Sequence, residues 1–202
     1  MTEQQGESLT YGILLFDGVE ELDFAGPFEV FGMAAKLAPG RLVTIAEQGG
    51  VVTGINGLRV LPDHAFADAP ALDVLLVPGG MGTRTEVDNP KLIEWLRGVA
   101  PGCRWVTSVC TGALLLHEAG IARKRRVTTH WGFVESLRAR GDVEVREDVR
   151  YVRDGNLVTA AGVSAGIDMA LWLLGEIHGA DFARKVQRMM EYDPAPPYAG
   201  EV

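Results

Sequence analysis

The sequence predicts an α/β protein in which a mostly parallel sheet is covered by helices on both faces. The first observation is that short, nearly continuous apolar runs alternate with longer helical patterns along the chain. Strands of this composition are buried on both faces, as in parallel sheets between two helical layers. The second observation is the length, because 202 residues suffice for one domain with a full core and are few for two. We expect a single domain over residues 1–202, with residues 1–9 as a flexible N-terminus.

The expected strands are apolar runs that end at turn residues. The run 11–16 has few polar interruptions, and the run 73–77 stops at a Pro-Gly-Gly turn. Residues 151–160 indicate a hairpin around an Asp-Gly-Asn turn, and glycine-rich turns make 49–61 a short β-excursion. In chain order, strands are expected at 11–16, 42–46, 73–77, 104–109, 126–129, 143–146 and within the hairpin 151–160.

The expected helices are bounded by capping residues. Asn89 can cap a helix whose first position suits Pro90. Gly120 is placed to end one helix, and Ser164 to cap a strongly apolar one. The prolines within residues 193–197 predict an extended tail. Helices are expected at 23–37, 89–99, 111–119, 131–139, 164–178 and 180–190.

Composition and charge exclude several classes of partner. Lys and Arg number 19 against 27 Asp and Glu, which gives a formal charge of −8 with His neutral. An acidic surface disfavours DNA and anionic membranes, and no apolar run reaches membrane-spanning length. The one basic run, residues 123–126, is expected to be a solvated loop. We predict no nucleic-acid partner and no membrane partner.

The cysteines and the N-terminus point to a reducing compartment. Two cysteines make no disulfide framework, and residues 1–8 carry no signal-peptide pattern, so the cytoplasm is the expected location. No His, Cys and carboxylate cluster has metal-ligand spacing, and neither a Walker loop nor a Gly-x-Gly-x-x-Gly follows the first strand. We expect an enzyme without metal or cofactor that acts on a small molecule.

Cys110 is the strongest candidate for a catalytic residue. In parallel sheets, sites lie at the C-terminal ends of strands, and Cys110 leads directly from a buried strand into a helix, which requires a sharp turn like a nucleophile elbow. A helix N-terminus favours thiolate, so the pKa of Cys110 is expected to fall. The alternative is an inert, buried cysteine that fills a small apolar space. Cys103, at the other end of the strand, is expected to be structural.

Residues after the other strands are candidates to assist Cys110. The glycine turn with Gly79 and Gly80 could aim N–H groups at a developing negative charge together with the Thr111 N–H, or it is a plain tight turn. Asp23 is either a helix N-cap or a carboxyl aimed at Cys110 with a raised pKa. Its neighbours Glu20 and Glu21 are expected to be solvated.

Of the four histidines, only His130 follows a predicted strand. It could serve as the base for Cys110, or it could have an orienting or structural role, and residue pattern alone leaves both open. The other three histidines, His64, His117 and His178, are expected to be packing or surface residues.

Taken together, these motifs resemble the ThiJ/PfpI superfamily. They are Leu-Asp-Phe-Ala-Gly-Pro at 22–27, Val-Pro-Gly-Gly at 77–80, Thr-Ser-Val-Cys-Thr-Gly at 107–112, Thr-Thr-His-Trp at 128–131, and Ala-Gly-Val-Ser-Ala-Gly-Ile-Asp at 161–168. The resemblance spans nearly the whole chain from residue 11 and implies the flavodoxin-like three-layer α/β/α sandwich of class I glutamine amidotransferase-like proteins. Within the superfamily, the motifs match the isonitrile hydratase (isocyanide hydratase) subgroup best.

The resemblance implies a set of roles and a reaction. Cys110 would be the nucleophile, Asp23 the acid and base, and Thr111 a neighbour acting through its hydroxyl or N–H, with His130 and Trp131 secondary. An isonitrile would be hydrated to an N-substituted formamide through a cysteine-bound thioimidate, without a cofactor. A homodimer is also implied. Phe24, Met81, Trp131 and Val163 are expected to line an apolar pocket.

Two other functions stay open. One is a different cysteine chemistry on the same site, of the glyoxalase or deglycase type. The other is a ligand-binding or redox-sensing module without turnover, since the same module occurs in AraC-type regulators. Thr111 departs from relatives with His after the cysteine, and Asp23 departs from relatives with Glu.

Overall fold

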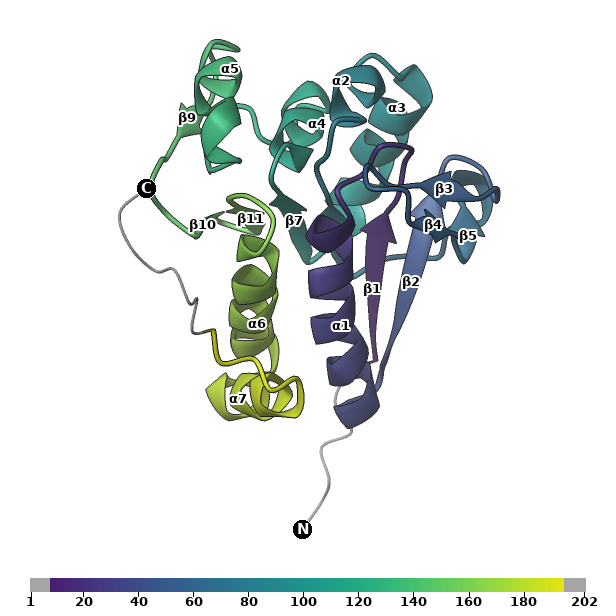
Figure 1. Cartoon of the computed structure of the whole chain (residues 1–202), viewed down its shortest axis with the longest axis vertical. Coiled ribbons are helices and arrows are strands. Elements are labelled where there is room, and N and C mark those ends of the chain that lie inside the picture. Colours follow the sequence, from purple (N-terminus) through teal and green to yellow (C-terminus); the bar gives the residue numbers. More distant parts are fainter. Residues whose placement is uncertain (1–7, 195–202) are drawn as a thin grey trace.

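The computed structural model describes residues 8–194 and shows a three-layer α/β/α sandwich of the flavodoxin-like type (Figure 1). Its sheet has seven strands in the order β10-β11-β7-β6-β1-β2-β5, all parallel except the hairpin β10–β11. The strands are β1 (Leu9–Leu14), β2 (Gly40–Ala46), β5 (His64–Ala65), β6 (Val74–Val77), β7 (Trp105–Val109), β10 (Tyr151–Asp154) and β11 (Leu157–Ala160). The predicted fold class is confirmed.

Helices cover both faces of this sheet. The helices within residues 8–194 are α1 (Glu21–Leu37), α2 (Thr83–Glu86), α3 (Pro90–Val99), α4 (Gly112–Glu118), α5 (Val134–Arg138), α6 (Ala165–His178) and α7 (Ala180–Met189). The chain moves from β1 to β2 in one direction across the sheet and from β6 to β7 in the other. Because parallel crossovers are right-handed, α1 and α3 lie on opposite faces, and α6 packs beside α1 (Figure 1).

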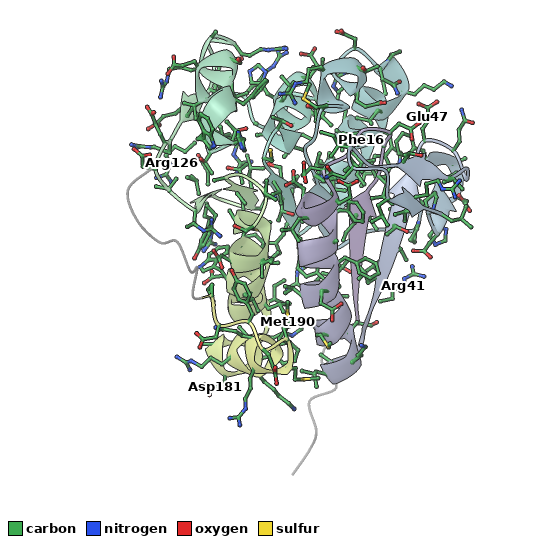
Figure 2. The ribbon with its side chains drawn as sticks, viewed as in Figure 1. Phe16, Arg41, Glu47, Arg126, Asp181 and Met190 are labelled. Atoms are coloured by element: carbon green, nitrogen blue, oxygen red, sulfur yellow. The ribbon has the colours of Figure 1, made fainter. Side chains whose placement is uncertain are left out.

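The core is made of the central strands, as their composition predicts. All four residues of β6 are buried, and so are the last four of β7. Figure 2 shows Phe16, just after β1, at the end of the sheet where the connecting loops gather, whereas Asp181 and Met190 lie at the opposite end with α7. The carboxyl ends of the parallel strands therefore meet at the Phe16 end.

Two predicted strands do not join the main sheet. The runs at 126–129 and 143–146 form only the two-residue strands β8 (Arg126–Val127) and β9 (Glu144–Val145), paired with each other. The chain leaves the strand after Val127 because the N–H of Thr128 donates to Thr159 Oγ1 at 2.7 Å instead of to a neighbouring strand. Residues 126–129 contain too few apolar residues to form a strand of the core.

Helix starts were predicted with mixed success. Asn89 caps α3, with its Oδ1 accepting from Lys91 N at 3.1 Å. Ser164 precedes α6 without a capping hydrogen bond, because its hydroxyl instead accepts from Arg150 at 3.3 Å. The expected helix 131–139 begins with a 3₁₀ turn, Trp131–Phe133, before α5.

The remaining short elements are peripheral. The β-excursion is a ribbon of β3 (Val52–Thr53) and β4 (Arg59–Val60), and two more 3₁₀ turns span Phe66–Asp68 and Ala100–Gly102. The helix α2 and the edge strand β5 had no clear sequence signal. The expected extended tail lies largely outside the described residues, as does the expected flexible N-terminus, although Leu9 already belongs to β1 and is buried.

The basic run is paired at the surface, as a solvated loop predicts. Arg125 and Arg126 approach Asp154 at 3.6 and 3.7 Å, and Arg123 lies 3.9 Å from Asp142. None of the helices within residues 8–194 combines the length and the apolar character that crossing a membrane requires.

Candidate active site

Cys110 lies on a strained turn at the carboxyl end of β7. Only Cys110 and Thr111 separate β7 from α4, and Cys110 has a φ of +55°, which is uncommon for a residue other than glycine. Its N–H donates to Ala161 O at 2.8 Å, and its carbonyl accepts from Thr129 Oγ1 at 2.8 Å. The sharp turn predicted from the sequence is confirmed, and the surrounding hydrogen bonds hold its strain at a candidate functional position.

The close approach of α4 to the sheet explains the glycine after Thr111. A Cβ on Gly112 would lie 2.1 Å from the carbonyl oxygen of Val77, at the end of the adjacent strand β6. Only glycine allows the turn to pass so near that strand. The same approach brings Cys110 next to the glycine turn that follows β6.

Asp23 is a buried carboxyl of this site and not a helix cap. It lies in the first turn of α1, which begins after Glu20, and its side chain is 0% exposed. Its Oδ2 accepts from the Gly79 N–H at 2.8 Å. Its Oδ1 is buried and has no conventional hydrogen-bond partner within residues 8–194. Of the two roles that the sequence left open, the structure favours the carboxyl directed at Cys110.

The pKa values of this carboxyl and of the thiol are coupled. Burial raises the pKa of Asp23 to about 7, while the Gly79 N–H and, more weakly, Cys110 lower it. Burial raises the pKa of Cys110 to about 12, and the Asp23 carboxylate adds to that rise. Above about pH 7, the pair therefore holds one proton, on sulfur, beside an ionised Asp23.

The expected fall of the Cys110 pKa is wrong. The N–H and hydroxyl of Thr111 do lower it, as a helix N-terminus should, but burial and the carboxylate of Asp23 outweigh them. The helix α4 is short, with seven residues, so its dipole adds little. Cys110 rests as a thiol that needs a base.

Thr111 ties the turn at Cys110 to the glycine turn. Its Oγ1 accepts from the Gly80 N–H at 3.0 Å and lies 3.1 Å from Thr83 Oγ1 in α2. A Cβ on Gly79 would lie 2.5 Å from the Thr111 nitrogen, and Gly80 has a φ of +123°. Both positions therefore require glycine for a tertiary reason.

The glycine amides are occupied, which corrects their expected use as donors to a developing charge. The Gly79 N–H holds Asp23, and the Gly80 N–H holds Thr111. In this structure the two glycines orient the acid and the threonine. The amides that act on the sulfur are those of Thr111 and Val163.

Val163 is a site residue for which the sequence had suggested only apolar contact. Its φ is +46°, a costly conformation for a β-branched residue, and its amide lowers the pKa of both Cys110 and Asp23. Its N–H is thus directed at this pair. A strained backbone leaves no local signal in a run of small residues, so residue pattern could not have revealed it.

His130 lies beside the site but is not paired with Cys110. Its Nδ1 accepts from the Gly132 N–H at 3.1 Å, and its ring edge packs so closely on Gly162 that a Cβ there would lie 2.4 Å from Cδ2. No hydrogen bond joins His130 to Cys110 or Asp23 in the described part of the chain. Since β8 is outside the main sheet, its end does not aim His130 at the sulfur. The neighbouring Trp131 is 83% exposed at the pocket mouth.

A cavity of about 300 Å³ opens over Cys110. Met81, Trp131 and Val163 line it as expected, whereas Phe24 is buried in the core. The complete lining is Glu20, Ile55, Gly80, Met81, Arg84, Cys110, Thr111, His130, Trp131, Gly132, Phe133 and Val163. Apolar and polar side chains therefore share the lining of this cavity.

Two acids that were expected to be solvated have definite places. Glu20 lines the cavity with Cys110. The Glu21 carboxylate accepts from both the N–H and the side-chain amide of Asn56, each at 2.7 Å. This contact holds the loop that presents Ile55 to the cavity. Long-range loop contacts of this kind have no signature in local sequence.

The second cysteine, Cys103, is not part of the site. Cys103 is buried, and its thiol contacts the carbonyl of Val99 at 3.5 Å. Within residues 8–194, no group of three or more His, Cys, Asp and Glu side chains could hold a metal ion.

A strained cysteine elbow, a buried carboxyl from α1 and a flavodoxin-like sandwich together define the class of protein. Residues 12–176 match the profile of the DJ-1/PfpI family, and the chain belongs to this family. It is 41% identical to an isonitrile hydratase from Pseudomonas putida over 191 residues, which cover 95% of this chain and 82% of that protein.

Two further comparisons show how widely this module is used. A solved structure of a ThiJ/PfpI family protein from Pseudomonas syringae superimposes with a TM-score of 0.89 at 31% identity, covering 96% of this chain and 79% of that one. The HTH-type transcriptional regulator GbdR from Pseudomonas aeruginosa is 28% identical over 185 residues, 90% of this chain but only 50% of the regulator. The chain spans about half of that regulator's length.

Proposed function

We propose that this protein is a cofactor-independent hydratase that converts an isonitrile into an N-substituted formamide. The observation that carries the proposal is the pairing of a strained Cys110 thiol with the fully buried Asp23, whose carboxyl has a pKa raised to about 7. The 41% identity to an isonitrile hydratase over 95% of the chain supports the choice of substrate.

The first half-reaction uses this pair. Asp23 takes the proton of the thiol as sulfur bonds to the terminal carbon of the isonitrile. Asp23 then returns the proton to that same carbon. The S–H bond is thereby added across one carbon atom, which leaves a thioimidate on Cys110 and an ionised Asp23. A carboxyl with a pKa near 7 can both take and give this proton at neutral pH.

In the second half-reaction, water attacks the thioimidate carbon, the C–S bond breaks, and the formamide leaves. One proton of the water ends on nitrogen and the other on sulfur, which regenerates the thiol. Covalent catalysis thus splits one difficult addition into two easier ones. The substituent of the isonitrile would lie in the cavity against Met81, Trp131 and Phe133.

The direct test is production of formamide from a simple alkyl isonitrile by the purified protein. The wild type and Cys103→Ala should give the same turnover, and Cys110→Ala should give only the background rate. Equal rates in wild type and Cys110→Ala would overturn the proposal.

A second candidate function is a regulatory or ligand-binding module without turnover. The observation that favours it is the match to a transcriptional regulator over 90% of this chain. It predicts binding of isonitrile or of another small molecule with no product. A third candidate, cysteine chemistry on α-oxoaldehydes, would be favoured if turnover of methylglyoxal exceeded turnover of isonitriles.

We also propose that two copies associate through the exposed side of α1. Leu22 and Phe28 expose 39% and 41% of their surface there, which is apolar area that a partner could cover. Light scattering should give twice the monomer mass for the wild type, and Phe28→Glu should shift it towards monomer. A monomeric wild type would rule out this assembly.

A further inference from the structure

The second half-reaction needs a base that can reach water, and Asp23 is poorly placed for it. The Asp23 side chain is 0% exposed, and one of its oxygens is held by the Gly79 N–H. Cys110 lines the cavity, whereas Asp23 is not among its lining residues. Water must then approach the carbon from the solvent side. This inference rests on the proposed hydratase function.

Two side chains of the types that serve as general bases line the cavity, the carboxylate of Glu20 and the imidazole of His130. The remaining charged lining residue, Arg84, is a permanent cation and cannot act as a base. The choice of base is therefore between a carboxylate and an imidazole.

The hydrogen bond of His130 excludes it as the base. Its Nδ1 accepts the Gly132 N–H at 3.1 Å, so the neutral ring carries its proton on Nε2. Nε2 is the other ring nitrogen, and in this tautomer it donates. Gly162 packs against the ring edge and limits its reorientation. His130 can orient water or substrate but cannot take a proton from water.

The backbone of Glu20 is held beside the catalytic turn, and its carboxylate makes no hydrogen bond to the start of α1. Its N–H donates to Gly79 O at 2.9 Å, and its carbonyl accepts from the Asp23 N–H at 3.2 Å, so its backbone is fixed to the catalytic turn. Although it is the N-cap residue of α1, its side chain makes no capping hydrogen bond. Burial, and then the neighbouring Glu21, raise the pKa of Glu20, which strengthens it as a base, while His130 lowers it.

We propose that Glu20 is the general base that activates water for hydrolysis of the Cys110 thioimidate. Glu20 takes a proton from water as the water oxygen bonds to the carbon, and the electron pair of the C=N bond moves to nitrogen. Glu20 passes that proton to nitrogen. The new hydroxyl then loses its proton to Glu20 as the C–S bond breaks with its electron pair on sulfur, and the sulfur takes up one proton from solvent. Glu20 releases its proton to solvent and returns to the carboxylate.

The test separates the two half-reactions in Glu20→Gln, with Glu94→Gln on the exposed side of α3, away from the cavity, as the matched control. On mixing with excess alkyl isonitrile, Glu20→Gln should consume one equivalent per site in a burst. Intact-protein mass spectrometry should show the added mass of one isonitrile on Cys110, and formamide release should slow by about 100-fold or more. Glu94→Gln should match the wild type, without an accumulated adduct.

The possible failures are distinguishable. A wild type with no turnover overturns the proposed function itself. If the wild type is active, two results for Glu20→Gln would overturn only the role of Glu20. One is an unchanged rate, and the other is loss of activity without an accumulated adduct. Accumulation in His130→Gln and not in Glu20→Gln also overturns it. Asp23→Asn should lose activity with no adduct, since it blocks the first half-reaction.

Discussion

Cys103 and Cys110 flank the same strand, β7, and differ in almost everything that matters for chemistry. Both are buried, and burial raises the pKa of Cys103 to about 11 and that of Cys110 to about 12. Cys103 has an ordinary φ of −82° and contacts a backbone carbonyl. Cys110 has a φ of +55°, opens onto a cavity and shares a proton with Asp23.

A low pKa of the resting thiol does not distinguish the candidate nucleophile, because the pKa is raised in both cysteines. Access to a cavity, a strained turn and a carboxyl able to take the proton distinguish Cys110. A carboxylate, Asp73, also acts on Cys103, but one of its oxygens accepts from the Thr10 N–H at 2.8 Å. The carboxyl end of the strand differs through its neighbours in space.

The largest expected effect tests the comparison directly. Cys110→Ser should reduce turnover of an isonitrile by about 10⁴-fold or more, because loss of a nucleophile removes the whole covalent route. Cys103→Ser should leave kcat/KM within about twofold while lowering stability modestly. Rates from formamide release and melting curves would measure both. Equal losses of activity in the two variants would remove the distinction.

Replacement of the buried acid should have the next largest effect. Asp23→Asn should lower kcat/KM by about 10²- to 10⁴-fold, the usual contribution of a general acid or base. In the wild type, kcat/KM should rise with pH through about 7, as Asp23 ionises and becomes able to take the thiol proton. In Asp23→Asn this rise should vanish. A pH profile with the same inflection in both proteins would assign it to another group.

The same carboxyl should make stability depend on pH. Its folded pKa of about 7 is above the value of 3.8 for an unperturbed aspartate, so the folded state binds more protons between those values. The free energy of unfolding of the wild type should therefore fall as pH rises from about 4 to 7, by about 4 kcal/mol at most. Asp23→Asn should lack this fall. Urea unfolding at pH 5 and pH 8 would measure the difference.

The smallest effect contrasts two glycines. Gly79→Ala places a Cβ 2.5 Å from the Thr111 nitrogen and should cost about 1–3 kcal/mol in stability, with loss of activity because Asp23 loses its place. Gly98→Ala, where no atom lies within 4 Å of the new Cβ in helix α3, should stabilise by about 0.5–1 kcal/mol. Chemical denaturation would compare them. If Gly79→Ala left stability and activity unchanged, the turn would be able to relax around the new Cβ.

Much of the fold was predictable because local pattern determines it. Continuous apolar runs led to a parallel sheet, the Asp-Gly-Asn turn led to the hairpin β10–β11, and Asn89 led to the start of α3. The failures were short runs. The pattern of residues 126–129 predicts a strand of four residues, but only Arg126 and Val127 form one, and it pairs with β9 outside the main sheet.

The candidate site was predictable only in its residue types and its place. Cys110 between a buried strand and a helix indicated the sharp turn, and the motif around Asp23 indicated a second participant. Sequence pattern could not choose between a cap and an acid for Asp23, because the choice depends on the Gly79 N–H, 56 positions away along the chain.

The layers of the sandwich and the position of the cysteine turn follow from local sequence, since both depend on the periodicity and turn chemistry of neighbouring residues. Three properties of the site arise from packing in three dimensions: the raised pKa of the thiol, the hydrogen bonds of the glycine amides to Asp23 and Thr111, and the presence of Glu20 and Val163 at the site. These properties depend on burial and on distances between segments far apart in the chain. Neither is encoded in any short stretch of residues.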